Sequence, residues 1–366
     1  MKNYTKEELA VILIDFYNGL EYKHKWAILS LYQRADELFI NPQKAFDYVQ
    51  KNLGNSALVT VKNSLFGKEY EAFVLKKLKT RSITAITYLS EAYPSIFKNL
   101  PSFPLVIYAK GNISLLNAKN TLGIVGSRKT LPFVLRAGEE IAREMANSGT
   151  VIVSGSAVGG DRSALIGALD SGNVISILAS GHDHVSPQSN RDLVQKIASN
   201  GLVISEYPPE SPALSWHFPM RNRLISALSD AVLILSGASD SGTKYTAKFA
   251  EAYSKRLYAI PYSIGERSGE ICNMLIKMGK AQLIETALDL ATVEGVELTV
   301  YNLPDLDEEE LYILSAMDGT THVDIIAMKT GRKAFEITPV LSMMEIKGVV
   351  ARNSNNTYTP LVKLKK

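Results

Sequence analysis

The feature that most constrains the fold is an alternation, from about Leu105 onward, of short apolar runs with amphipathic segments of helix length such as 134–147 and 245–255. The runs are rich in β-branched residues and end in small or loop-forming residues. They are Leu122-Gly-Ile-Val, Val151-Ile-Val, Val174-Ile-Ser-Ile-Leu, Leu202-Val-Ile, Ala231-Val-Leu-Ile-Leu and Leu257-Tyr-Ala-Ile. Such alternation predicts an α/β protein with a Rossmann-like, doubly wound parallel sheet covered by helices on both faces.

Two segments flank the predicted sheet. Residues 1–92 place apolar positions at helical spacing, which predicts an N-terminal helical domain. The proline-rich stretch 93–104 follows, and prolines at this density stop helices, as they do at a domain boundary. We therefore expect a helical domain at 1–92, a Rossmann-like domain at 93–298 and a third domain at 299–366.

The third domain is expected to be a winged helix. The pattern changes after Tyr301-Asn-Leu-Pro304-Asp, and the tail from Val349 predicts a hairpin with its turn at 353–356. Three short helices are predicted before it, at 308–317, 322–330 and 334–347.

The composition is typical of a soluble globular protein. Of the 366 residues, 46% are hydrophobic and 21% are charged, and no apolar run approaches the ~18 residues of a membrane span. Acidic residues interrupt the apolar run near the N-terminus, so we expect no secretory signal. The one cysteine, Cys272, excludes a disulfide framework and favours the cytoplasm. A net charge of +3 allows a polyanionic partner.

A loop of small residues follows the run at 151–153 and precedes a helix-forming segment. In α/β proteins this order brings backbone amides and a helix N-terminus to a phosphate, so Ser154, Gly155, Gly159 and Asp161 are candidate phosphate-binding residues. The spacing is neither GxGxxG nor GxxxxGK[ST]. A nicotinamide cofactor or an ATPase is therefore not expected.

Three further donor-rich turns follow other runs. Because the carboxyl ends of parallel strands share one edge of a sheet, we expect all four turns to converge. Several phosphate contacts in a row suit a nucleic-acid backbone better than a mononucleotide. The candidates in the three turns are Gly126, Ser127, Arg128 and Lys129, then Arg221, Asn222, Arg223 and Ser226, and finally Gly242 and Lys244. Trp216 and Phe218 could stack on bases or could equally anchor their helix.

No catalytic residue and no metal site is predicted. Four carboxylates at strand ends or in the following loops could act as general bases, but we interpret them as partners of arginines such as Arg221 and Arg223. They are Asp161, Asp183, Glu206 and Asp240. His182 and His184 resemble half of a metal site, but no third ligand follows at a suitable spacing. We expect a binding protein that is not an enzyme and has no metal and no cofactor.

At these residues the chain resembles the DNA-processing protein A family (DprA, also called Smf). The resemblance runs from the 93–104 stretch through Gly123-Ile-Val-Gly-Ser-Arg128 to Ala259-Ile-Pro261, and its most specific block is Ser205 to Ser229. It implies a Rossmann-like central domain, a helical (SAM-like) N-terminal domain and a C-terminal winged helix. It also implies a cytoplasmic homodimer, formed through the central domain, that binds and protects incoming single-stranded DNA and loads RecA recombinase onto it during natural transformation.

By position in the family motifs, Arg128, Arg221 and Arg223 would hold DNA phosphates. Gly155, Gly159 and Asp161 would shape the pocket. The chain departs from the pattern at several places: Val158 replaces an arginine, Gly160 an apolar residue, Leu165 a histidine, Ser186 a tyrosine and Ser236-Gly237 a Glu-Ala pair. Loss of one arginine should flatten the salt dependence of DNA binding by roughly one unit of log–log slope.

Two other hypotheses stay open. The chain could be a small-nucleotide sensor or a nucleotide-cleaving enzyme of the same Rossmann-like superfamily, with Asp161 or Glu206 as the acid. Alternatively, the winged helix could read duplex DNA. Its predicted recognition helix, 334–347, is poorly charged for a major groove, since Lys333 and Lys347 are its only basic ends.

Overall fold

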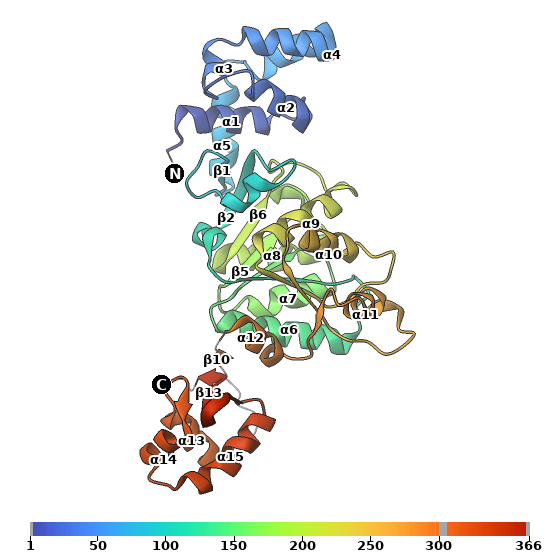
Figure 1. Ribbon diagram of the computed structural model, residues 1–366. Coiled ribbons are helices and arrows are strands. Elements are labelled where there is room, and N and C mark those ends of the chain that lie inside the picture. Colours follow the sequence, from blue (N-terminus) through green and yellow to red (C-terminus); the bar gives the residue numbers. More distant parts are fainter. Residues whose placement is uncertain (1–2, 297, 300–305, 364–366) are drawn as a thin grey trace.

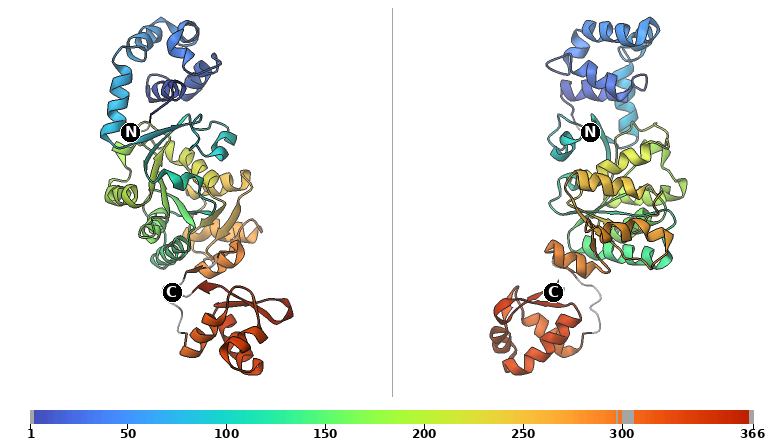
Figure 2. Two further views of the ribbon diagram at one scale, coloured as in Figure 1. Left: turned by 90° about the vertical axis from the view of Figure 1, so that its left-hand side faces the viewer. Right: turned by 45° about the vertical axis from the view of Figure 1, so that its right-hand side comes forward.

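The computed structural model describes residues 3–296, 298–299 and 306–363. Three parts follow one another from end to end: a helical part, a central sheet with helices, and a small C-terminal part (Figure 1). The helix α5 runs from the helical part down to the sheet (Figure 2). No helix in the ranges described is long and apolar enough to cross a membrane.

The central sheet has nine strands in the order β1-β2-β6-β5-β4-β3-β7-β8-β9. All neighbours from β6 to β9 are parallel, as the alternating pattern predicts. At the other edge, β2 pairs antiparallel with both β1 and β6, so the prediction of a wholly parallel sheet is wrong there. Antiparallel neighbours need no crossover helix, and only short 3₁₀ segments flank β2. The strands are β1 Thr84–Thr87, β2 Val106–Gly111, β3 Thr121–Val125, β4 Val151–Gly155, β5 Val174–Ile177, β6 Leu202–Ser205, β7 Ala231–Ile234, β8 Arg256–Ala259 and β9 Gln282–Leu283.

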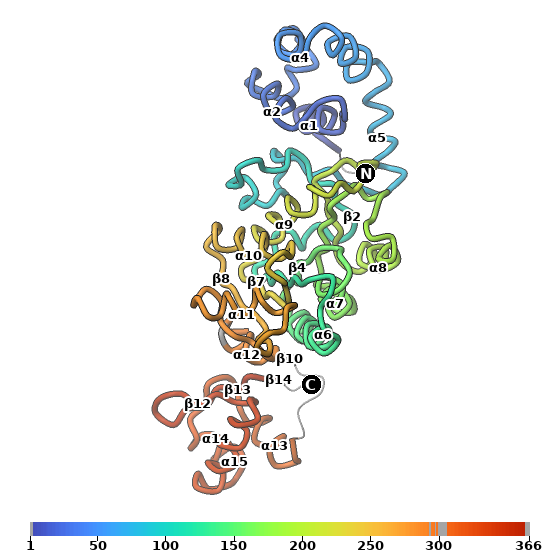
Figure 3. The backbone as a smooth tube through the Cα atoms, turned by 90° about the vertical axis from the view of Figure 1, so that its right-hand side faces the viewer, coloured from blue at the N-terminus to red at the C-terminus, as the bar shows by residue number. Residues whose placement is uncertain are grey.

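Helices cover both faces of this sheet. Alternate strand residues enter two cores, with Val151 and Val153 of β4 on one side and Ile152 on the other. Figure 3 shows α6, α7 and α8 to one side of the strands and α10 and α11 to the other. The prediction of a doubly wound sheet is thus confirmed. The helices are α6 Pro132–Asn147, α7 Gly160–Ala168, α8 Arg191–Asn200, α9 His217–Leu228, α10 Thr243–Ala252, α11 Glu270–Lys277 and α12 Ala287–Glu294.

The N-terminal part is helical, but it ends earlier than expected. Its last helix stops at Thr80, and residues 84–87 already form β1 of the central sheet. The proline-rich stretch 93–104 therefore lies between β1 and β2 and not at a domain boundary. It is packed because its aromatic residues Tyr93 and Phe97 are buried in the sheet's core. The helices are α1 Lys6–Phe16, α2 Tyr22–Leu29, α3 Glu37–Ile40, α4 Gln43–Ser64 and α5 Tyr70–Thr80.

The helical part and the sheet share one core. Val106 and Tyr108 of β2 pack among the helices, whereas Ile107 and Ala109 face the sheet's own core. The Tyr108 hydroxyl donates to Asp15 Oδ2 at 2.7 Å. The helical part is therefore joined to the central sheet by a shared hydrophobic core and not by a linker alone.

The C-terminal part combines three helices with a three-stranded antiparallel sheet in the order β11-β13-β12. The predicted hairpin is present, with a 3₁₀ turn at Ser354–Asn356. The predicted boundary after residue 298 falls on β10, and the pattern change at 301–305 lies outside the described residues. The elements are β10 Leu298–Thr299, α13 Glu308–Ala316, β11 Thr321–His322, α14 Val323–Thr330, α15 Ala334–Ile346, β12 Val350–Arg352, β13 Thr357–Pro360 and β14 Val362–Lys363.

Candidate nucleic-acid interface

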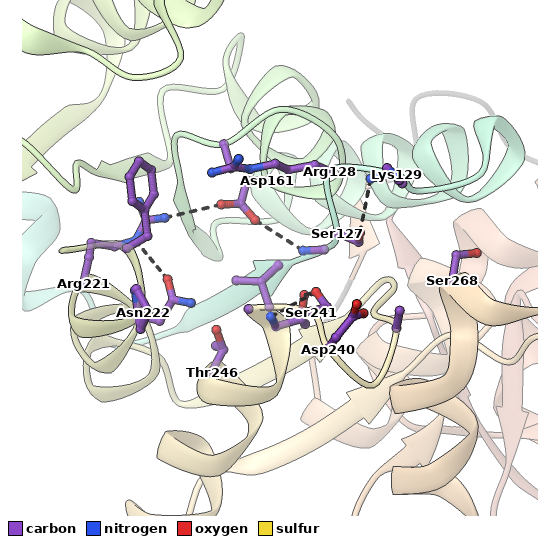
Figure 4. A pocket seen from close by; sticks show the side chains of 18 of the residues that line it. Ser127, Arg128, Lys129, Asp161, Arg221, Asn222, Asp240, Ser241, Thr246 and Ser268 are labelled. Carbon is purple, nitrogen blue, oxygen red and sulfur yellow. Dashed lines mark hydrogen bonds and ion pairs between the residues drawn. The ribbon is translucent and has the colours of Figure 1, made fainter. Parts of the chain in front are cut away.

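A pocket of about 1000 Å³ opens at the carboxyl ends of the central strands (Figure 4). The strand β3 has β4 on one side and β7 on the other, and the connections after β3 and β7 lead away in opposite directions. In open α/β sheets such a reversal of strand order leaves a crevice for ligands. The pocket lies there, between the turns after β3, β4, β7 and β8 and the start of α9.

Most of the predicted turns converge on this pocket, but not every predicted residue lines it. The candidates that line it are Gly126, Ser127, Arg128, Lys129, Asp161, Phe218, Arg221, Asn222 and Gly242. Those that do not are Ser154, Gly155, Gly159, Trp216, Arg223, Ser226 and Lys244.

Arg128 and Lys129 bring two positive charges to the pocket. Both are exposed, and neither forms an ion pair with any residue in the described part of the chain. The Arg128 guanidinium lies 5.5 Å from the centre of the Phe218 ring. The backbone of their turn is held in place, since the Ser127 amide donates to Ser236 Oγ at 2.8 Å and the Lys129 amide to Ser127 Oγ at 3.2 Å. A cation beside an aromatic ring, with a second cation on the same turn, can bind a phosphate and the base next to it.

Arg221 lines the pocket but is buried and paired. Its Nη2 lies 3.7 Å from Asp161 Oδ2, and its Nη1 donates to the Ile177 carbonyl. Burial lowers the pKa of Arg221 and raises the pKa of Asp161, and each charge opposes the effect of burial on the other. The pair carries little net charge, so Arg221 can offer a phosphate fewer free donors than the sequence predicts.

Two glycines make this arrangement possible. A side chain at Gly155 would collide with the Asp161 carboxylate and the Arg221 guanidinium. Gly159 has φ +84°, and a side chain there would collide with the Ser127 carbonyl. These glycines shape the pocket without lining it.

The prediction that Arg223 contacts a phosphate is wrong in this structure. Its side chain is buried away from the pocket and forms an ion pair with Glu206, so it is not available to a strand in the pocket. Every third or fourth residue of a helix shares a face, and the face of α9 that carries Arg223 packs inward.

The structure also contradicts the predicted phosphate contacts of Ser226 and Ser154, because both hydroxyls are buried and donate within the protein. Ser226 is buried, and its hydroxyl donates to the Thr246 carbonyl at 3.0 Å, which joins α9 to α10. The Lys244 ammonium lies 5.5 Å from the centre of the Tyr245 ring, outside the pocket, and its phosphate contact stays a prediction. Ser154 is likewise structural, because its hydroxyl donates to the Ile124 carbonyl at 2.6 Å.

The interpretation of the four carboxylates as arginine partners is confirmed. Each pairs with one arginine: Asp161 with Arg221, Glu206 with Arg223, Asp183 with Arg81 and Asp240 with Arg267. The described residues include no group of three or more His, Cys, Asp or Glu side chains that could hold a metal ion.

The turn after β8 contributes pocket residues that the sequence analysis missed. Glu266, Arg267 and Ser268 line the pocket, and the Glu266 carboxylate accepts from the Ser268 amide at 3.0 Å. The carboxyl ends of parallel strands share one edge of the sheet, and β8 lies next to β7. The same argument applied to the run at Leu257 would have found this turn. On this side of the pocket, Arg267 pairs with Asp240, and the Glu266 carboxylate accepts hydrogen bonds from Ser268.

The central part of the chain is similar to known proteins. The family described as DNA recombination-mediator protein A matches residues 84–294, which is more than half of the chain. The DNA processing protein DprA of Bacillus subtilis is 34% identical over 192 residues, or 52% of this chain and 65% of that protein. The protein Smf of Synechocystis is 33% identical over 210 residues, or 56% of this chain and 53% of that protein. The matched region thus spans less than two thirds of either relative.

Two solved structures are similar. DprA from Streptococcus pneumoniae has a TM-score of 0.63 at 27% identity and covers 80% of this chain and 98% of its own. DNA processing protein A from Helicobacter pylori, whose structure was described for its single-stranded DNA binding mode, has a TM-score of 0.54 at 31% identity and covers 58% and 97%. This chain belongs to the DNA recombination-mediator protein A family.

Proposed function

We propose that this protein binds single-stranded DNA in the pocket at the carboxyl edge of its central sheet, without enzymatic turnover. The observation that carries the proposal is a pair of cations at the reversal of strand order, Arg128 beside Phe218 and Lys129 next to it, which form no ion pair with any described residue. Cations that neutralise phosphates, next to aromatic rings that stack on bases, are what single-strand binding requires. The DNA-binding mode described for the Helicobacter pylori relative supports the same assignment.

We further propose the biological role that family membership suggests. In that role the protein is a cytoplasmic homodimer that protects incoming single strands and loads RecA recombinase onto them during natural transformation. The pairing of Asp161 and Glu206 with arginines supports binding over hydrolysis, since a carboxylate that neutralises a buried arginine is not free to act as a general base.

The C-terminal part is proposed to be a winged helix that does not read duplex DNA. Its order of three helices and a hairpin supports the winged helix. The exposed residues of α15 include Phe335, Met343 and Ile346 together with the acidic Glu336 and Glu345. Major-groove recognition depends on basic and polar side chains, so this surface does not suit it.

Titration calorimetry with a thymidine oligomer, a duplex and mononucleotides tests the proposed function. We expect the oligomer to bind more tightly than the duplex, with an affinity that falls steeply as salt rises, because phosphate contacts release counterions. Saturable mononucleotide binding without oligomer binding would overturn the proposal in favour of a small-nucleotide sensor.

Trp216 is expected to report on the bound strand. Its side chain is 59% exposed, and Trp216 directly precedes α9 between Ser215 and Phe218 in the sequence, which both line the pocket. The chain has one other tryptophan, Trp26, so the Trp26→Phe variant leaves Trp216 as the sole indole. Adding the oligomer should quench its fluorescence, because a base stacked on the indole quenches emission. Unchanged emission at saturating oligomer would rule out stacking on Trp216, and the Trp216→Phe variant supplies the matched control.

A further inference from the structure

One hydroxyl group in the pocket is buried and has no hydrogen-bond partner. Thr246 lines the pocket with 0% of its surface exposed, and its Oγ1 has no partner among the residues described. Figure 4 shows this side chain projecting from α10 toward the pocket. Nearly all buried polar groups in proteins are hydrogen-bonded, so an unpartnered hydroxyl lowers the stability of the free protein and requires an explanation.

Two further uncharged donors come from the same side of the pocket. The Gly242 amide, at the N-terminal end of α10, donates to no group in the described ranges. Asn222 accepts from Arg221 Nε through its Oδ1 at 3.1 Å, which leaves its Nδ2 without a partner there. Both residues line the pocket with Thr246. The positive end of the dipole of α10, a helix of 10 residues, lies at the same place.

We propose that Thr246 Oγ1, Gly242 N and Asn222 Nδ2 form a phosphate seat at the N-terminus of α10. A helix N-terminus with free donors favours an anion, and a phosphodiester of the bound strand supplies the oxygens that these donors lack. Figure 4 shows Thr246 and Asn222 on the other side of the pocket from Arg128 and Lys129, so the strand would be held from both walls. The Asp240 carboxylate on the same turn is paired with Arg267 at 3.4 Å. This inference rests on the proposed function, because it assumes that a single strand enters this pocket.

The Thr246→Val variant tests the seat, since valine has nearly the shape of threonine without its hydroxyl. We expect an unchanged or higher melting temperature, because an unpartnered buried polar group is removed. The affinity for the thymidine oligomer should fall by about 5- to 10-fold, the typical net worth of one hydrogen bond. The slope of log affinity against log salt should stay as in the wild type, because threonine carries no charge.

Thr150→Val is the matched control. Thr150 Oγ1 is also buried without a partner, but it directly precedes β4, at the end of the strand opposite the pocket. This variant should show the same effect on the melting temperature and none on the affinity. Wild-type affinity in Thr246→Val would overturn the seat and leave the proposed function standing, whereas a wild-type protein that binds no oligomer would overturn both.

Oligomers of different chemistry distinguish a phosphate contact from a base contact. If the hydroxyl binds a phosphate, the loss in Thr246→Val should be equal on thymidine, cytidine and abasic oligomers, which share a backbone. A loss confined to one base would mean that Thr246 reads a base edge, and the phosphate seat would be wrong.

Discussion

Replacing Arg223 by alanine is expected to destabilise the protein by about 3–5 kcal/mol, because a charge of a buried ion pair is left without its partner. The side chain of Arg223 is only 7% exposed and that of Glu206 only 11%. Burial raises the pKa of Glu206, and Arg223 is the cation that opposes this rise. Chemical denaturation measures the loss as a shift in the midpoint of the main unfolding transition.

The double variant Arg223→Met with Glu206→Leu is the control for this prediction. It removes both charges, and apolar replacement of a buried ion pair is often neutral or stabilising. The double variant should regain the stability that Arg223→Ala loses, because Glu206 Oε1 and Arg223 Nε and Nη1 have no hydrogen-bond partner among the described residues. If the Arg223→Ala protein were stably folded but had lost DNA binding, Arg223 would be a phosphate-binding residue after all, and this prediction would be wrong.

The contrast between Arg221 and Arg223 shows what a sequence motif can and cannot predict. Both stand near the start of α9, and their positions in the motif predict phosphate contacts for both. Which face of a helix packs inward depends on the surrounding tertiary structure, and here it turns Arg223 toward Glu206 and Arg221 toward Asp161. The convergence of the turns on one edge was predictable, because it follows from the parallel strands alone.

In the fold, too, some elements were predictable from the sequence and others were not. Periodicity predicted β3 to β8, because each is a short and almost entirely buried apolar run. It did not predict β9, because Gln282–Leu283 has only two residues and both are exposed. It also did not predict β1, because Thr84–Thr87 begins only three residues after α5, in a segment whose pattern was interpreted as helical. The prolines at 94 and 104 indicated a break in helical structure, and they do break it, but proline content does not reveal whether the intervening aromatic residues pack into a core.

Removing Arg128 and Lys129 together is expected to weaken single-stranded DNA binding the most. A hydrogen bond to a charged group contributes about 1.5–3 kcal/mol, so two lost contacts correspond to an affinity at least ~100-fold lower. Both side chains are exposed, and their loss should leave the melting temperature unchanged. Each lost phosphate contact should also flatten the salt dependence by about 0.7 units of log–log slope, the value for single strands.

A second double variant, Lys119→Ala with Arg143→Ala, separates the pocket from net charge. It removes the same charge, but Lys119 precedes β3 at the opposite edge of the sheet and Arg143 lies in the second half of α6, paired with Glu139. Long-range attraction between exposed charges is screened within ~8 Å at physiological salt, so this variant should bind almost as the wild type does. If fluorescence anisotropy gave both double variants the same loss of affinity, binding would depend on overall charge, and Arg128 and Lys129 would have no special part in it.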